Sequence, residues 1–557
     1  MTAATLRGLL PHRSDYVDVR RTWKGDLAAG ATVGIVALPL ALAFGISSGA
    51  GAAAGLVTAV VAGLVAAVFG GSNIQISGPT GAMAVVLVPI VGEHGVAAVA
   101  LVGILAGLAL VAAGLLGLGQ LIGLVPWPVI AGFTAGIGAI IFLQQVPLVL
   151  DSSGALGRRP VAAAIDAVQS ADWAAAGWPL LVVLVVVGIM LLLGRLAPRL
   201  PGSLLAIVLV TVLAELGDLP LARIGELPSS LPAPAVPSLE PEVISAVLGA
   251  AVAVAALSAI ESLLSARVAV DLSGDARYNP DRELVGQGLA CVASGSFGGI
   301  PATGAIARTA VAVRSGGQTR LVAISHSVVL LGVIYLASGP VSRIPMAALA
   351  AVLMLTAVRM IPYQEVRTIL RSTRADAIVL VLTMAVTVLV DLIEAVQLGI
   401  GVAALFALLA VARTSGVRRE EITSAPIAED ERIAVYRLSG SMFFGAAERV
   451  RSEVSAEGSI EVVILAFSEL RTLDATGANT LAEIVRALES QGVTVLIKGV
   501  PAAHLPLMQS VGVIDSLRHQ RHLFDTFPPA LEHARSHVRR SAQSRLSQER
   551  PAPVTLT

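Results

Sequence analysis

Long apolar runs separated by short polar segments occupy the first three quarters of this chain. Runs long enough to cross a bilayer, allowing for short broken helices, fall at about 27–47, 51–70, 96–118, 121–145, 175–194, 203–217, 243–264, 321–338, 346–361, 375–392 and 396–412. Shorter helical pieces fit residues 79–92, 284–297 and 303–313. The pattern therefore predicts fourteen membrane elements, arranged as two sets of seven.

An odd number of elements in each half places the second half upside down relative to the first. This is the inverted-repeat arrangement of many transporters. A short sequence repeat supports the duplication, because Thr-Gly-Ala-x-Ala occurs at residues 80–84 and again at 303–307. A chain this rich in alanine and glycine can also repeat such a motif by chance. Each copy opens one of the short helical pieces, so the two pieces are predicted to be paired broken helices.

Arginine is distributed unequally between the loops that this arrangement creates. With the N-terminus inside, the inner loops hold fourteen arginines, namely Arg195, Arg199, Arg267, Arg277, Arg282, Arg314, Arg320, Arg359, Arg367, Arg371, Arg374, Arg413, Arg418 and Arg419. The outer loops hold only Arg158, Arg159, Arg223 and Arg343. Because inner loops carry the positive excess, both termini are expected on the cytoplasmic side of a plasma membrane.

Composition agrees with this membrane assignment and narrows the chemistry. Of the 557 residues, 55% are hydrophobic and 14% are charged, and the mean hydropathy is +0.82. Net charge is zero, which gives no sign of a nucleic-acid partner, and the single Cys291 cannot form an internal disulfide. The eight histidines are scattered, no nucleophile–base arrangement stands out, and no Walker-type phosphate loop is present. An enzyme is therefore not expected, and neither is a cofactor other than a coupling ion.

The composition becomes charged and periodic after about residue 420. Residues 432–438 and 462–467 alternate or run apolar like strands, 479–491 form an amphipathic helical pattern, and 493–499 form another strand pattern. This order predicts a small α/β domain. The expected division is a cytoplasmic N-terminus at 1–24, a membrane domain at 25–415, the α/β domain at 430–536 and a disordered tail at 537–557.

Several long motifs resemble one family. They are Gly-Asp-Leu-Ala-Ala-Gly-Ala-Thr-Val-Gly at 25–34, Pro-Leu-Ala-Leu-Ala-Phe at 39–44, Ile-Ser-Gly-Pro-Thr-Gly at 76–81, Phe-Gly-Gly-Ile-Pro-Ala-Thr-Gly at 297–304 and Arg-Ser-Gly-Gly-Gln-Thr at 314–319. In order and spacing the chain resembles the sulfate permease (SulP) family, and its C-terminal part is similar to that family's STAS domain. The resemblance implies core and gate domains, elevator-like alternating access and a homodimer.

The paired broken helices suggest an anion site. Two helix N-termini that face each other present unpaired backbone N–H groups and positive dipole ends, and Arg308 adds a full charge. Arg308 could instead be the counter-charge of Glu261, or serve both roles in turn. The candidate substrate-binding residues are Phe44, Ser77, Thr80, Gly81, Ala82, Thr303, Gly304, Ala305, Ile306, Ala307 and Arg308.

Glu261 is an isolated carboxylate inside an apolar span, so it must be protonated, paired or cation-bound. A carboxyl in a low-dielectric medium takes up a proton more readily than in water, and it could equally ligate sodium together with Ser265, one helical turn on. A static ion pair with Arg308 is the structural alternative. The family resemblance favours a coupling role for Glu261. In that family, the acidic residue at the matching position looks like the proton or cation site.

The C-terminal domain carries Leu-Asp-Ala-Thr-Gly at 473–477. In the anti-sigma factor antagonists that the STAS domain resembles, a phosphorylated serine follows this aspartate. Here Ala475 follows Asp474 and has no hydroxyl group, which leaves Thr476 as a weak candidate. We expect Asp474 to cap a helix in a dimerisation or regulatory scaffold.

These observations predict a secondary active transporter of a small oxyanion, coupled to protons or sodium. Residues 37–45 and 388–393 resemble the bicarbonate branch of the family, whereas Arg308 resembles the sulfate branch. A dicarboxylate transporter of the same family is an alternative. An anion channel, or a sensor that signals through the STAS domain, is another. The expected partners are the transported anion, membrane lipid and a second copy of the chain.

Overall fold

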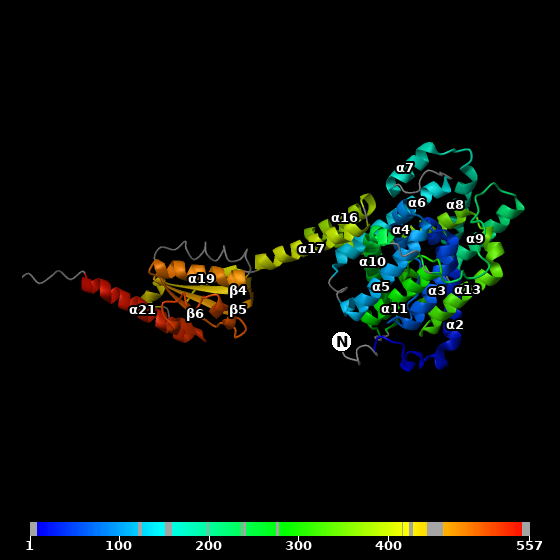
Figure 1. The fold of residues 1–557 in the computed structure, drawn as a ribbon. Helices are drawn as coiled ribbons and strands as arrows, with labels where there is room; N and C mark the ends of the chain where they lie inside the picture. Colours follow the sequence, from blue (N-terminus) through cyan, green and yellow to red (C-terminus); the bar gives the residue numbers. More distant parts are fainter. Residues whose placement is uncertain are drawn as a thin grey trace, which may run out of the picture. The chain divides into compact units, whose positions relative to one another are not determined.

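A computed structural model describes residues 8–120, 125–150, 159–197, 200–235, 237, 241–274, 278–390, 392–414, 416–422, 427–442 and 460–548. The chain divides into two compact units, Met1–Ala403 and Ala404–Thr557 (Figure 1). The first unit is helical and the second contains a five-stranded sheet. Each unit is described by itself below.

All fourteen predicted membrane elements are helices; α2 begins before its apolar run at 27–47, and α10 continues beyond its run at 243–264. The first seven are α2 (Val19–Ser47), α3 (Ala52–Phe69), α4 (Gly81–His94), α5 (Val96–Leu115), α6 (Trp127–Val149), α8 (Gly177–Leu196) and α9 (Gly202–Leu216). The second seven are α10 (Pro241–Ser273), α11 (Pro280–Ser296), α12 (Ile306–Arg314), α13 (Leu321–Ser342), α14 (Met346–Met360), α16 (Arg374–Leu389) and α17 (Leu392–Thr414). Within the described residues, eight helices are long and apolar enough to cross a membrane.

Two further helices, α7 (Pro160–Ser170) and α15 (Tyr363–Leu370), were not predicted from the sequence. Both are short. The first carries polar residues such as Asp166 and Gln169 on a partly buried helix, and the second is mostly exposed apart from Ile369. Neither produces an apolar run of membrane length, so the hydropathy pattern did not reveal them.

The helices of the first unit pack into two groups. Helices α2, α3, α5, α10, α11, α12 and α13 pack against one another and, with α4, form the core group. Helices α6, α8, α14 and α16 pack together as the gate group, with α7 against α6 and α9 against α8. Helices of the core group approach one another closely. A Cβ on Gly107 of α5 would lie 2.5 Å from the carbonyl oxygen of Gly288 of α11. Only glycine permits this approach of the two helix backbones.

The two broken helices meet through a short antiparallel ladder. Strand β1 (Ser77–Gly78) pairs with β2 (Thr303–Gly304), with Ser77 opposite Gly304 and Gly78 opposite Thr303. Helix α4 begins at Gly81, after Pro79 and Thr80, and α12 begins at Ile306, after Ala305. The sequence prediction that the two helix starts lie close together is therefore confirmed.

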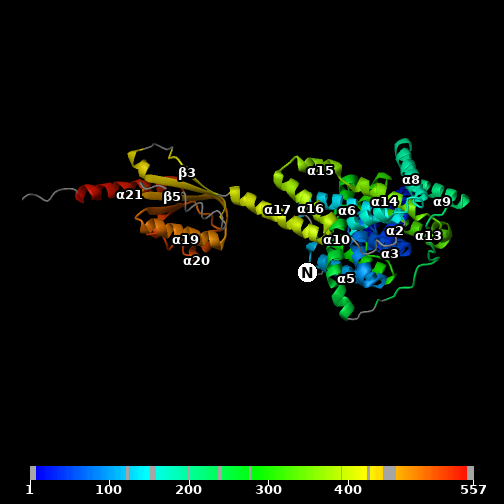
Figure 2. The same cartoon turned by 90° about the horizontal axis from the view of Figure 1, so that it is seen from above.

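The second unit is a mixed sheet covered by helices on both faces (Figures 1 and 2). The strand order is β3-β4-β5-β6-β7, with β3 (Gly416–Glu420) antiparallel to β4 and the other pairs parallel. The remaining strands are β4 (Ile433–Met442), β5 (Val462–Leu473), β6 (Thr494–Lys498) and β7 (Leu523–Phe524). Helices α19 (Ala475–Ser490) and α20 (Leu505–Ser510) cover one face, and α21 (Phe527–Gln548) covers the other. The predicted strands and central helix are confirmed.

The predicted disordered tail is the main difference in this unit. Helix α21 continues from Phe527 to Gln548, so residues 537–548 are helical, and only 549–557 lie outside the described residues. The segment forms a helix because Leu531, Ala534 and Val538 form an apolar stripe that is buried against β4, β5 and β6. The polar composition of this segment concealed the stripe.

An ion pair fixes α21 to the short 3-10 helix η3 (Ala428–Arg432). Asp430 accepts hydrogen bonds from Nε and Nη2 of Arg535 at 2.8 and 2.7 Å. These bonds lower the pKa of the Asp430 carboxyl below its usual value. The pair therefore stabilises the fold above the pKa of an unfolded aspartate, and this contribution is lost as pH falls through the lower pKa of the folded state.

We expect Asp430→Asn to destabilise the C-terminal unit by about 1.5–3 kcal/mol at pH 7, the usual range for a charged hydrogen bond. Differential scanning calorimetry of the full chain in detergent measures the change. Glu429→Gln is the matched control, because the Glu429–Arg539 pair is more exposed and should contribute about 0–1 kcal/mol. The difference between wild type and Asp430→Asn should shrink as pH falls below about 4. A constant difference down to pH 2 would contradict the ion-pair explanation.

Candidate anion and coupling site

The start of α4 is defined by Thr80. Its side-chain oxygen accepts a hydrogen bond from the backbone N–H of Met83 at 3.5 Å, in the manner of a helix N-cap. On the other side of the ladder, the N–H of Ala305 donates to the carbonyl oxygen of Ile76 at 2.8 Å, and α12 begins at Ile306. The first N–H groups of a helix have no partner within the helix, so both starts present donors and positive dipole ends at one place.

Arg308 lies in the first turn of α12 and is buried. Its Nη2 donates a hydrogen bond to the carbonyl oxygen of Pro79, immediately before the start of α4. Its Nη1 is also buried and, among the described residues, has no hydrogen-bond partner. Burying a guanidinium with an unused donor is costly unless a negative group accepts that hydrogen bond and balances the charge. This arrangement is suited to an anion that joins Arg308 and the two helix starts.

Gly78 is required by the position of this guanidinium. A Cβ at residue 78 would lie 2.8 Å from Nη1 of Arg308, and the glycine adopts a φ of 153°. Thr303 and Gly304 are buried on the opposite strand, where a Cβ at Gly304 would overlap the side chain of Gln75. The ladder residues therefore shape the site by being small.

The start of α4 contacts both helix groups. A Cβ on Gly81 would lie 2.1 Å from Cδ1 of Ile141 in α6 and 3.2 Å from Cε1 of Phe44 in α2. Phe44 is buried, as is Ala82, so both of these candidate residues lie beside the helix start. In α12, Ile306 and Ala307 are exposed, whereas Arg308 is directed into the protein. The candidate anion site thus lies where the core group faces α6 of the gate group.

Glu261 of α10 is connected to the same turn. Its Oε2 accepts a hydrogen bond from the Thr80 hydroxyl at 2.9 Å. Among the described residues, no ion pair joins Glu261 to Arg308 within 4.0 Å, so the static pair considered from the sequence is not formed in this structure. Instead, Arg308 contacts Pro79 and Glu261 contacts Thr80. Consecutive residues of one turn therefore connect the arginine and the carboxylate.

Ser265 of α10 is hydrogen-bonded to α12. Its hydroxyl lies 3.1 Å from Oγ1 of Thr309, which also accepts the N–H of Ile76 at 3.0 Å. Glu261 and Ser265, the two predicted sodium ligands, thus belong to separate hydrogen-bonded groups. Ser265 thus secures α12 to α10, and Thr309 also secures α12 to the chain before β1.

The structure adds buried polar residues that the sequence analysis missed. In α10, Ser258 donates to the carbonyl oxygen of Ala302, and the Ser262 hydroxyl lies 3.0 Å from Oγ1 of Thr303. The 258, 262 and 265 spacing places three serines on one helix face, which was a detectable signal. Three further buried polar side chains surround the β1–β2 ladder, namely Gln75, Gln287 and His326. Gln75 donates to the carbonyl oxygen of Ser262, and Gln287 accepts from the Ser77 hydroxyl, so these partners come from distant segments and no local pattern indicated them. Both ring nitrogens of His326 are buried without a hydrogen-bond partner among the described residues.

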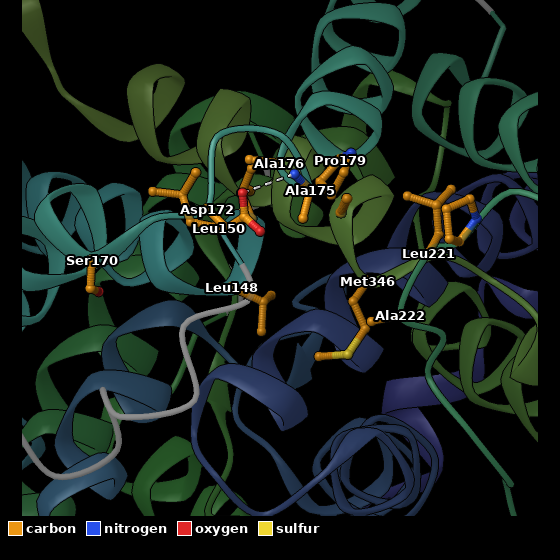
Figure 3. Close-up of a pocket in the computed structure, with 13 residues that line it drawn as sticks. Leu148, Leu150, Ser170, Asp172, Ala175, Ala176, Pro179, Leu221, Ala222 and Met346 are labelled. Atoms are coloured by element: carbon orange, nitrogen blue, oxygen red, sulfur yellow. Dashed lines mark hydrogen bonds between the residues drawn. The ribbon is translucent and has the colours of Figure 1, made fainter.

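The pocket in Figure 3 is a separate feature. It has a volume of about 510 Å³ and is lined by the end of α6, the end of α7 and the chain that follows it, the start of α8, residues 220–222 and the start of α14. Asp172 points into this region and accepts the N–H of Ala174 at 3.0 Å and that of Ala175 at 3.4 Å. None of the predicted anion-site residues lines it.

Two predictions concern the second unit. Asp474 caps α19, because its Oδ1 accepts the N–H of Gly477 at 2.7 Å, so the capping role is confirmed.

The expectation that the histidines form no cluster is wrong. His522, His533 and His537 are brought together, and the physical reason is that α21 folds back onto the strand that follows His522.

Comparisons with known families identify both parts of the chain. A model described as the Sulfate permease family matches residues 23–383, and a model described as the STAS domain matches residues 424–530. A "Putative sulfate transporter YvdB" of Bacillus subtilis is 34% identical, covering 90% of this chain and 96% of that protein. A "Bicarbonate transporter BicA" of Synechocystis is also 34% identical, covering 86% of this chain and 88% of that protein.

Solved structures show the same fold. The transmembrane domain of a cyanobacterial bicarbonate transporter BicA is 36% identical and aligns with a TM-score of 0.62, covering 68% of this chain and 98% of that one. Murine Solute Carrier 26 family member A9, in the inward-facing state, aligns with a TM-score of 0.83 over 96% of this chain and 95% of that one. That second likeness, at 16% identity, concerns the fold alone.

Proposed function

The chain belongs to the sulfate permease family, and on that premise we propose that it moves a small oxyanion, sulfate or bicarbonate, by secondary active transport coupled to protons or sodium. The observation that carries this proposal is the buried Arg308 at the paired starts of α4 and α12, whose Nη1 has no hydrogen-bond partner among the described residues. An oxyanion offers several acceptor oxygens to these donors. A planar guanidinium binds such a group through two parallel hydrogen bonds.

Coupling follows from the charges around the turn at Pro79 and Thr80. Without substrate, the positive Arg308 and the negative Glu261 balance each other across this turn. A bound anion leaves an excess negative charge in a medium where it is costly. A proton on Glu261, or a sodium ion beside it, restores the balance. Anion and cation therefore favour each other's binding, which is the requirement for symport.

Alternating access is proposed to be elevator-like. All the polar residues of the candidate site belong to the core group, which packs tightly within itself, whereas the gate group supplies Ile141 at the start of α4. A core that moves as one body would carry the site past the apolar surface of the gate. We also propose a homodimer in the plasma membrane with both termini cytoplasmic, an orientation supported by the arginine distribution.

Transport into proteoliposomes tests the function directly. We expect accumulation of sulfate or bicarbonate that requires an inward proton or sodium gradient, with fumarate as the dicarboxylate comparison. Flux of anions that is independent of both gradients would indicate a channel. Binding of an anion without any flux would indicate a sensor. Either result would contradict secondary active transport.

A further inference from the structure

Three histidines of the second unit meet at one place. His522 ends the short 3-10 helix η4 (Gln520–His522), and His533 and His537 lie on α21. One ring nitrogen of each residue lies within 4.8 Å of those of the other two. The Nε2 atoms of His533 and His537 are 3.3 Å apart. The ring centroid of His522 is 5.4 Å from that of each partner.

The backbone fixes this geometry. His533 and His537 are four residues apart on a helix, so they lie on one face, one turn from each other. The apolar stripe of α21 holds that helix against the sheet, while β7, which follows His522 directly, pairs with β6. The third imidazole, that of His522, is therefore positioned by the edge strand of the sheet on which the helix packs.

His522 shows that the cluster is incomplete by itself. Its side chain is 1% exposed, and its Nδ1 is buried without a hydrogen-bond partner among the described residues. Burying a polar nitrogen in this way is costly. A fourth histidine, His519, lies nearby, with its ring centroid 5.5 Å from that of His522.

Burial favours the neutral form of two of these rings. Burial, reinforced by the neighbouring histidines and Arg518, lowers the pKa of His522 to about 4. Burial together with Arg540, His533, Arg518 and His519 lowers the pKa of His537 to about 4. Neutral imidazoles are the ligating species at neutral pH. Arg540, the cation that acts on His537, donates a hydrogen bond from its Nη2 to the hydroxyl oxygen of Ser536 at 3.2 Å.

We propose that His522, His533 and His537 bind a transition-metal ion of the Zn²⁺ class and thereby join α21 to the edge of the sheet. Zinc–nitrogen bonds of about 2.0–2.1 Å in a tetrahedral site place two ligand nitrogens about 3.3–3.4 Å apart. The 3.3 Å separation of the two Nε2 atoms already fits this spacing. Imidazole is a preferred ligand of zinc, copper and nickel, and the fourth position would be taken by water or His519.

Metal binding by the purified full-length protein tests the proposal. After treatment with a chelator, the protein in detergent is dialysed against ZnCl₂, and bound zinc is measured by mass spectrometry. We expect one high-affinity zinc per chain and a higher melting temperature of the C-terminal unit in its presence. His533→Ala and His537→Ala should weaken binding at least about tenfold. Co²⁺ substitution should give visible d–d absorption bands in wild type that both variants lose.

His504→Ala is the matched control, because His504 belongs to the same unit but not to the cluster. It should bind zinc like wild type. His537→Gln keeps a polar side chain of similar size, and its metal-free melting temperature separates loss of a ligand from loss of the fold. If wild type binds no more zinc than the folded His537→Gln variant, the proposal is overturned. The 3.3 Å contact would then be a hydrogen-bonded histidine pair only.

Discussion

Arg308→Ala should weaken anion binding by about 10- to 100-fold, or abolish transport, while the protein remains folded. The reason is that Arg308 supplies the full positive charge at the starts of α4 and α12, and its buried Nη1 has no other described partner. A lost charged hydrogen bond costs about 1.5–3 kcal/mol, which corresponds to this range of affinity. Concentration-dependent uptake into proteoliposomes measures the effect.

Two further variants separate charge from geometry at this site. Arg308→Lys should recover only part of the affinity, because an ammonium group lacks the planar fork that can hold both Pro79 and an oxyanion. Arg314→Ala, at the exposed end of the same helix, should behave like wild type. An unchanged apparent affinity in a folded Arg308→Ala protein would make Arg308 a structural charge and remove it from the proposed anion site.

Glu261→Gln should lose accumulation driven by a gradient but retain exchange of anion for anion. An amide cannot change its charge, so it can neither take up the driving proton nor neutralise sodium. The anion donors are on α4 and α12, so downhill exchange does not need the carboxylate. Uptake and exchange are measured in the same proteoliposomes, once with a proton gradient and once with a sodium gradient.

Glu242→Gln is the control, because it changes an exposed carboxylate at the start of the same helix. Intact uphill uptake by Glu261→Gln with either gradient would exclude Glu261 as the coupling group. If Glu261 only neutralises Arg308, its replacement should also impair anion binding. In that case Glu261→Gln combined with Arg308→Ala should restore stability without restoring transport.

Thr80 should connect the two functions. Its hydroxyl donates to Glu261, and its backbone follows Pro79, whose carbonyl accepts from Arg308. We expect Thr80→Val to uncouple uptake from the gradient in part, whereas Thr80→Ser keeps the hydroxyl and should retain coupling. Equal coupling ratios for the two variants would show that the hydrogen bond to Glu261 is not used.

The order and approximate bounds of the fourteen membrane helices were determined by the sequence alone. A membrane span needs only an apolar run of sufficient length, and each span satisfies its backbone hydrogen bonds internally, so local composition was sufficient. The repeated Thr-Gly-Ala-x-Ala also predicted correctly that two helix starts lie together; the β1–β2 ladder between them was not predicted. Strands such as β4 and β5 were recognisable because both faces of a covered parallel sheet are apolar.

Only the tertiary structure decided which side chains meet. Glu261 contacts Thr80 instead of Arg308, and Ser265 contacts Thr309. The histidine cluster likewise depends on α21 returning to the sheet edge, and that helix was expected to end in a disordered tail. Each of these contacts joins residues from separate elements. Their distances are set by helix rotation and by close packing, which periodicity along one segment does not encode.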